Sequence, residues 1–259
     1  MLVPSKEFNN IKIHTQYSIC EGAIKIDDLA DYCKINKIKA IGLADTNNLC
    51  GALEFSEKIS KVGTQPIIGT QINLSFESII GKITLYATSE KGYKNLTKLS
   101  SLSYLKKKDT HEPSCDLNDL ISNNEDLILL TGSYKNLFGQ LFYSNKEKNV
   151  KELIEKLKST FDNRIYIEIQ RHEENQEKNY ENYLLSLSSS YDLPIIASQE
   201  VYYLDPNMAE AHDALICIGE KQFIDDQNRF KYSKYHYFKT QDEIKILYKD
   251  IPEALENNY

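Results

Sequence analysis

Short apolar runs alternate with amphipathic stretches along most of the chain. A short run of largely apolar residues is typical of a buried strand in a parallel sheet, and apolar residues at helical spacing indicate a helix that packs on it. Strands are predicted at 10–14, 40–44, 66–69 continuing into 71–76, 82–87, 127–131, 164–169 and 194–197. Helices are predicted at 27–36, 51–62, 92–105, a short segment from 116, 150–161, 175–188, 208–218, 240–248 and 251–258.

This alternation predicts the class of the fold. About seven strands separated by helices favour a parallel sheet with helices outside it. Right-handed units in this number close most simply into a barrel. An open doubly wound sheet is the alternative, but the Gly-rich phosphate turn that its nucleotide-binding version needs after the first strand is missing. No Pro/Gly-rich linker or low-complexity tract divides the chain.

Composition narrows the class of function. The chain has 259 residues, 41% of them hydrophobic, and a net charge of -7, which argues against a surface built mainly to grip nucleic acid. Its five cysteines are scattered and form no C-x-x-C pair, as expected of reduced thiols in the cytoplasm. No apolar run approaches the roughly 18 residues of a membrane span, so no membrane partner is expected.

Polar side chains collect where the predicted strands end. In a barrel of alternating strands and helices, the active site forms at this edge. The residues at or just after the strands are Lys12, His14, Glu21, Asp45, Thr46, Gln71, Lys82, Ser133, Glu168, His172, Glu200 and Tyr202. Histidines and carboxylates that converge could bind zinc or manganese, whereas two lysines in the same place oppose a divalent cation. Taken singly, each of these residues is better explained as an ordinary polar residue of a loop.

Several segments together resemble a known family. IHTQYS at 13–18, LADTNNLCGALEF at 43–55 and PIIGTQ at 66–71 are similar to the first three motifs of PHP (polymerase and histidinol phosphatase) domains. AHDALICIG at 211–219 and DIPEAL at 250–255 resemble the PHP domains found at the N-terminus of bacterial DNA polymerase III alpha subunits. Each motif is weak alone, but their order is specific.

The resemblance implies the architecture in more detail. It implies a PHP-type distorted (β/α)7 barrel with parallel strands inside and helices outside. The whole of 1–259 is then one PHP domain, with the barrel over about 1–220. The remaining segment, about 221–259, closes the barrel and leads into a polymerase region that this sequence does not include.

The sequence departs from the metal-bearing members of the family at most ligand positions. The positions that have lost the family residue are Lys12, Thr46, Lys82 and Tyr202 in place of histidine, Gln71 in place of glutamate, Ser133 in place of cysteine and Glu200 in place of aspartate. Only His14, Asp45 and His172 keep the ligand type. The resemblance therefore implies a vestigial site, which also includes Glu21, with no catalytic residue and no expected metal. Any remaining ion would use His14, Asp45, His172 and Glu200.

Lys12 gives a physical reason for an empty site. From the first strand its ammonium would project toward Asp45 and Glu200 and neutralise carboxylates that a metal otherwise would. Losing the metal while keeping buried carboxylates would leave unpaired charge, which is costly. Lys12 and Lys82 together offset that cost.

Other chemistry-bearing residues have simpler explanations. His212 is predicted to cap or pack, and neither His111 nor His236 is assigned a role. The eighteen tyrosines are spread through the predicted elements, so packing explains them better than base stacking. The basic and aromatic segment 231–239 could touch DNA or a neighbouring domain, and the neighbouring domain is favoured.

Two functions are weighed. The preferred one, implied by the resemblance, is an inactive scaffold that packs on the polymerase domain of the same chain and docks the proofreading exonuclease subunit. DNA is then contacted through the parent polymerase, no cofactor is needed here, and Mg²⁺ belongs to the absent polymerase domain. The alternative is a metal-dependent PHP phosphoesterase or 3′–5′ exonuclease with a reduced metal site.

Overall fold

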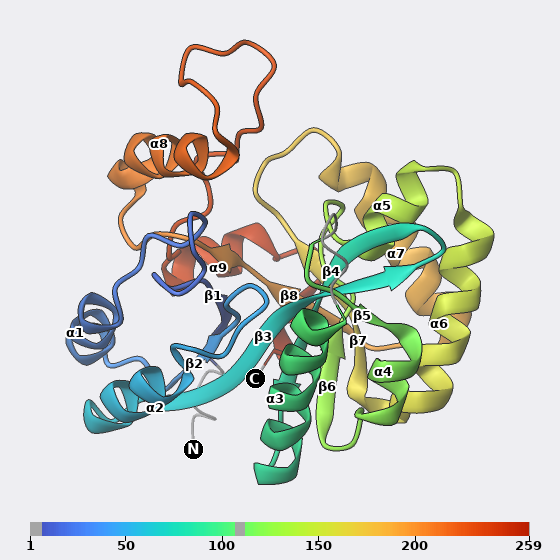
Figure 1. Ribbon diagram of the computed structural model, residues 1–259. Helices are drawn as coiled ribbons and strands as arrows, with labels where there is room; N and C mark the ends of the chain where they lie inside the picture. The colour runs from blue at the N-terminus through green and yellow to red at the C-terminus, as the bar shows by residue number, and fades with distance from the viewer. Residues whose placement is uncertain (1–6, 107–111, 259) are drawn as a thin grey trace.

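The computed structural model describes residues 7–106 and 112–258 and contains one large sheet surrounded by helices (Figure 1). Its path runs β8-β7-β6-β4-β3-β2-β1-β9, and β5 pairs with β3 beside this path. The strands are β1 Asn10–Ile13, β2 Ala40–Leu43, β3 Gln65–Phe76, β4 Ile79–Ala87, β5 Cys115–Asp116, β6 Leu127–Leu130, β7 Ile165–Gln170, β8 Ile195–Ser198 and β9 Glu200–Val201. The predicted α/β barrel architecture is confirmed in this nearly closed, mostly parallel sheet.

Residues 195–201 bring the two ends of the sheet together. β8 pairs with β7, whereas β9 pairs with β1 at the other end of the path, and only Gln199 separates β8 from β9. One short stretch of chain therefore belongs to both ends of the sheet. This double pairing places Lys12 of β1 opposite Glu200 of β9.

The prediction of uniformly parallel strands is wrong for β4. β4 is antiparallel to both of its neighbours, β3 and β6. Only Glu77 and Ser78 separate β3 from β4, and both have positive φ, 48° and 65°. A two-residue connection of this kind closes a hairpin, because a parallel neighbour needs a crossover of a dozen or more residues. The two predicted segments 66–69 and 71–76 accordingly form one continuous strand.

Helices cover the outside of the sheet where the sequence predicts them, with one addition, α5. They are α1 Ile26–Asn36, α2 Ala52–Lys61, α3 Glu90–Leu105, α4 Leu117–Ser122, α5 Leu137–Tyr143, α6 Glu147–Phe161, α7 Glu177–Tyr191, α8 Ala209–Glu220, α9 Gln241–Leu247 and α10 Pro252–Glu256. α8 stands away from the barrel in Figure 1, above the loop that follows β1. The predicted loop at 106–113, including His111, lies largely outside the described residues.

The strands have two chemically different faces. Ile165, Ile167 and Ile169 of β7 belong to the apolar cluster that the helices share, while Tyr166 packs against a separate small cluster formed by Ile11, Tyr86, Leu130 and Ile196. Alternation along a strand then places Glu168 and Gln170 on the same face as Tyr166. The barrel interior is therefore apolar toward one end and polar toward the end where the parallel strands finish.

Among the described residues, no helix is long and apolar enough to cross a membrane.

Candidate functional site

A buried ion pair occupies the polar end of the barrel interior. The Lys12 ammonium lies 3.1 and 3.2 Å from the two carboxylate oxygens of Glu168 and 3.8 Å from Glu200 Oε1. The side chains of Lys12 and Glu168 are both fully buried. Gln170 Nε2 donates to Glu168 Oε1 over 2.7 Å, and the Ser198 hydroxyl donates to the same oxygen. Glu168 thus has one cation and two neutral donors.

Glu200 joins this ion pair to the first strand and its loop. Its Oε1 accepts a hydrogen bond from Gln71 Nε2 over 2.6 Å and lies 3.1 Å from His14 Nε2. Burial by itself would raise the pKa of Glu200, but Lys12 and His14 outweigh that effect and hold the pKa well below its usual value. Glu200 is therefore a carboxylate anion at neutral pH.

Asp45 has a separate set of partners. Its Oδ1 accepts from the Thr15 backbone N–H over 2.6 Å and from Ser18 Oγ over 2.7 Å, and its Oδ2 accepts from Thr15 Oγ1 over 2.7 Å. Burial raises the pKa of Asp45, and these donors only partly oppose the rise. Ser18 Oγ also lies 3.2 Å from His14 Nδ1, so the serine links Asp45 to the histidine.

The predicted contact between Lys12 and Asp45 is therefore wrong. The predicted contact between Lys12 and Glu200 exists but is long, and the short contact of Lys12 is with Glu168. The reason lies in the β1–α1 loop, whose backbone N–H and hydroxyl groups reach Asp45 directly. These neutral donors satisfy both carboxylate oxygens without a cation. Lys12 instead points into the barrel, where β7 supplies Glu168.

A second, partly exposed ion pair lies near the Asp45 network. Lys82 Nζ is 2.7 Å from Glu21 Oε1, and Thr46 Oγ1 donates to Glu21 Oε2 over 2.5 Å. Burial would raise the pKa of Glu21, but Lys82 and other partners lower it overall. The Thr46 backbone N–H donates to Ser18 Oγ over 3.1 Å, which joins this pair to the Asp45 network.

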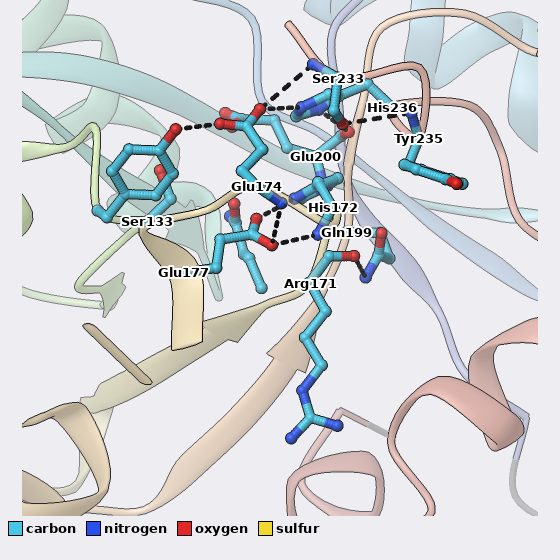
Figure 2. Close-up of polar contacts among 12 residues, drawn as sticks. Ser133, Arg171, His172, Glu174, Glu177, Gln199, Glu200, Ser233, Tyr235 and His236 are labelled. Atoms are coloured by element: carbon cyan, nitrogen blue, oxygen red, sulfur yellow. Dashed lines mark hydrogen bonds and ion pairs between the residues drawn. The ribbon is translucent and has the colours of Figure 1, made fainter. Parts of the chain in front are cut away.

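Two stacked histidines extend the buried network from Glu200 toward Glu174 and Glu177 (Figure 2). The rings of His172 and His236 lie 3.9 Å apart and nearly parallel, at 7°. His172 Nε2 accepts from the Glu200 backbone N–H over 3.2 Å, and its Nδ1 is 3.2 Å from Glu177 Oε1. Burial lowers the pKa of both histidines, most strongly that of His172. The stack is therefore neutral near pH 7.

Glu174 and Glu177 both lie beside the stacked histidines, but their pKa values shift in opposite directions. Glu174 Oε1 is 3.3 Å from His236 Nε2, and Lys135 Nζ is 2.7 Å from Glu174 Oε2. Burial would raise the pKa of Glu174, but His236 and Lys135 bring it down to about 2. Burial raises the pKa of Glu177 to about 7, because its backbone hydrogen bonds and Lys135 only partly oppose the rise.

The predicted site residues do not all meet. Tyr202 stacks on His14 with ring centroids 4.6 Å apart, and the remaining predicted residues except Ser133 join the hydrogen-bonded network just described. Ser133 bonds instead to Asn136 at the start of α5, over 3.1 Å. His212, predicted to cap or pack, packs against Tyr202 and bonds to the Glu21 carbonyl over 2.8 Å.

Some members of the network were not singled out from the sequence. Glu168 was among the strand-end residues but not in the vestigial site, although a carboxylate between the isoleucines of a buried strand signals a polar barrel interior. His236 was assigned no role, and nothing in the sequence around it indicates that the chain returns after α8 to stack it on His172. Thr15 and Ser18 are small hydroxyl residues in a loop, and only the folded structure shows that both donate hydrogen bonds to Asp45.

The donor set does not fit the metal site that the resemblance implies for other members. Both oxygens of Asp45 and both nitrogens of His14 and His172 have partners, and Glu200 Oε1 is shared by Gln71, His14 and Lys12. In the part of the chain that the structure describes, no three His, Cys, Asp or Glu side chains are arranged to hold a metal ion.

Known proteins with similar sequences come from the family that the motifs resemble. The profile of the PHP domain matches residues 10–172. The DNA polymerase III subunit alpha of Caulobacter vibrioides is 33% identical over 96% of this chain and 23% of its own length, and that of Vibrio cholerae is 32% identical over 97% and 22%. A solved two-domain protein from Bacteroides vulgatus, described as containing a predicted PHP-like metal-dependent phosphoesterase, is 12% identical to this chain with a TM-score of 0.49. The match covers 76% of this chain and 52% of that protein.

Replacing Lys12 tests the buried ion pair. Lys12→Met would leave Glu168 buried and unpaired, which typically costs about 3–5 kcal/mol in the free energy of unfolding. Adding Glu168→Gln should restore part of this loss because both charges then go together. Chemical unfolding of the wild type, both single variants and the double variant measures the coupling energy.

Asp45→Asn provides the matched control for this cycle. Because Asp45 has no direct contact with Lys12 and is linked to it only through Ser18, His14 and Glu200, its coupling energy with Lys12 should be clearly smaller than that of Glu168. Coupling of Lys12 to Asp45 rather than to Glu168 would contradict the geometry.

The low pKa of Glu174 predicts a pH dependence of stability. A carboxyl with a pKa of about 2 when folded and about 4.5 when unfolded stabilises the fold fully above pH 4.5, and the contribution is lost as the pH falls toward 2. By pH 3.5 the loss is roughly 1.4 kcal/mol. The difference in unfolding free energy between wild type and Glu174→Gln should therefore shrink by about this amount between pH 6 and pH 3.5. A difference that stays constant over this range would refute the assignment.

Proposed function

This chain belongs to the PHP domain family, and we propose that it is the PHP region of a DNA polymerase III alpha subunit that serves as a non-catalytic scaffold. The chain spans about a fifth of the curated relatives that it matches, 23% and 22% in the two named above. Primer extension from deoxynucleoside triphosphates with Mg²⁺ would be carried out by other parts of the parent chain. In this proposal the chain works in the cytoplasm and contacts DNA only through the parent polymerase.

The buried Lys12–Glu168 ion pair is the observation that supports an inactive barrel. A hydrolytic site of this kind requires carboxylates and imidazoles free to bind metal, and a metal-bound water activated as nucleophile. Here an ammonium fixed on Glu168 and close to Glu200 supplies the positive charge. A divalent cation added beside it would be repelled and would have to displace several hydrogen bonds.

Packing on the polymerase domain and docking of the proofreading exonuclease subunit complete the proposal. Both follow from the resemblance to the alpha subunit. A barrel whose interior carboxylates Asp45, Glu168 and Glu200 all have partners suits such a role, because a docking surface on well-ordered elements needs less ordering when the partner binds. An ordered barrel would not by itself catalyse hydrolysis, which also needs a reactive group.

Phosphoester hydrolysis is the alternative, and it can be tested directly. With added Zn²⁺ or Mn²⁺, we expect no turnover of bis(p-nitrophenyl) phosphate or of the 3′ end of a DNA strand. The variants His14→Ala and His172→Ala provide the control for contamination. Turnover that both variants abolish while they remain folded would establish the metal-dependent enzyme instead.

Binding of the exonuclease subunit tests the scaffold role. Mixed with the proofreading exonuclease subunit of the same organism, the chain should elute from a gel-filtration column as a complex. The complex should also survive chelation by EDTA, since no metal is expected to hold it together. Separate elution of the two proteins at concentrations of tens of micromolar would argue against docking through this domain.

A further inference from the structure

A hollow of about 380 Å³ lies between α1, the turn that follows β9 and the start of α9, apart from the Lys12 network. Its walls are mainly apolar and aromatic. Tyr32, Leu204, Tyr237 and Phe238 form them, and Asp205 and Glu243 also line the hollow. A volume of this size, with apolar walls and few polar groups, is typical of a binding pocket.

The aromatic floor is part of the packed structure. The rings of Tyr32 and Phe238 contact each other with centroids 4.8 Å apart and an interplanar angle of 50°. Both side chains pack with the apolar cluster formed by α1, α2 and the first strands. The floor is therefore preorganised, and a ligand would not have to order it.

Carboxylates lie around this apolar floor. Asp205 Oδ1 accepts from the Asn207 backbone N–H over 2.8 Å, and no described residue donates to its Oδ2. Burial would raise the pKa of Glu243, but hydrogen bonds from Tyr237 and Thr240 and the nearby Lys239 lower it overall, so this carboxyl is ionised at neutral pH.

Asp205 is the pocket carboxylate that is free to pair with a cation. Among the described residues it forms no salt bridge with a lysine, arginine or histidine, whereas both carboxylate oxygens of Glu243 already accept hydrogen bonds from Tyr237 and Thr240. An apolar pocket bordered by negative charge suits an arginine or lysine side chain, whose methylene stem would lie on the rings while its charged end meets the carboxylates. A nucleic-acid phosphate would be repelled by the same charges.

We propose that this pocket binds a peptide segment of a partner protein that carries an arginine or lysine between apolar residues. The Asp205 carboxylate pairs with the cation, and the ionised Glu243 beside it adds negative charge. The rings of Tyr32 and Phe238 with Leu204 cover the apolar residues. The inference goes beyond the proposed scaffold role, and it stands or falls separately because the pocket takes no part in the Lys12 network.

A synthetic peptide, acetyl-Gly-Leu-Arg-Leu-Gly-amide, serves as the probe. Titrated into the ¹⁵N-labelled chain, it should shift the backbone amide signals of the pocket residues with a millimolar or lower Kd. Asp205→Asn should weaken this binding about threefold, since it removes one partly exposed ion pair. Asparagine keeps the hydrogen bond to Asn207, so the fold is retained.

The controls separate this site from general charge attraction. Asp242→Asn removes the same charge from a neighbouring side chain that is 91% exposed and does not line the pocket, so the Kd should change by less than about twofold. Peptides with norleucine or glutamate in place of arginine should bind at least about threefold more weakly. The proposal would be overturned if all three peptides bound equally or if no signals shifted at the pocket. It would also be overturned if the signals shifted with protein concentration alone, which would show a second copy of the chain in the pocket.

Discussion

The buried lysine of β1 constrains the rest of the barrel. Its charge needs a compensating carboxylate because an unpaired ion in a low-dielectric interior is costly. Glu168 provides that charge from β7 and Glu200 contributes from β9, so three strands from distant parts of the sequence depend on one ammonium group. Such a pair adds little net stability compared with an apolar core, but it makes wrong pairings of these strands expensive.

The arrangement also separates two kinds of carboxylate within a short distance. Asp45 is satisfied by neutral donors and has a raised pKa, whereas Glu200 lies beside the Lys12 ammonium and accepts hydrogen bonds, and its pKa is lowered. Burial acts in the same direction on both, so the difference comes from their partners alone. A carboxylate that is retained at a family position therefore does not by itself show which charge or reactivity the group has in this chain.

The sequence predicts the outline of the molecule because local rules decide it. The 116–122 helix is an example, since Asp116 and Asp119 form a capping box that is visible in the sequence. It also predicts that Lys12 replaces lost positive charge near Glu200. It does not predict the reversed direction of β4, which depends on a two-residue turn, or the choice of Glu168 over Asp45. Those outcomes depend on which strands become neighbours, and residues 156 positions apart carry no local signal of contact.

The double pairing of residues 195–201 has a consequence for the order in which the protein can be completed. A ribosome makes chains from the N-terminus at about 5–20 residues per second. β1 therefore exists for roughly 10–40 s before β9 is synthesised and can pair with it. Throughout that interval one side of β1 is an open edge, and Lys12 lacks Glu200 and, for most of it, Glu168. The sheet therefore cannot close before about residue 201 has been made, and until then the unpaired side of β1 is an edge open to pairing with other strands.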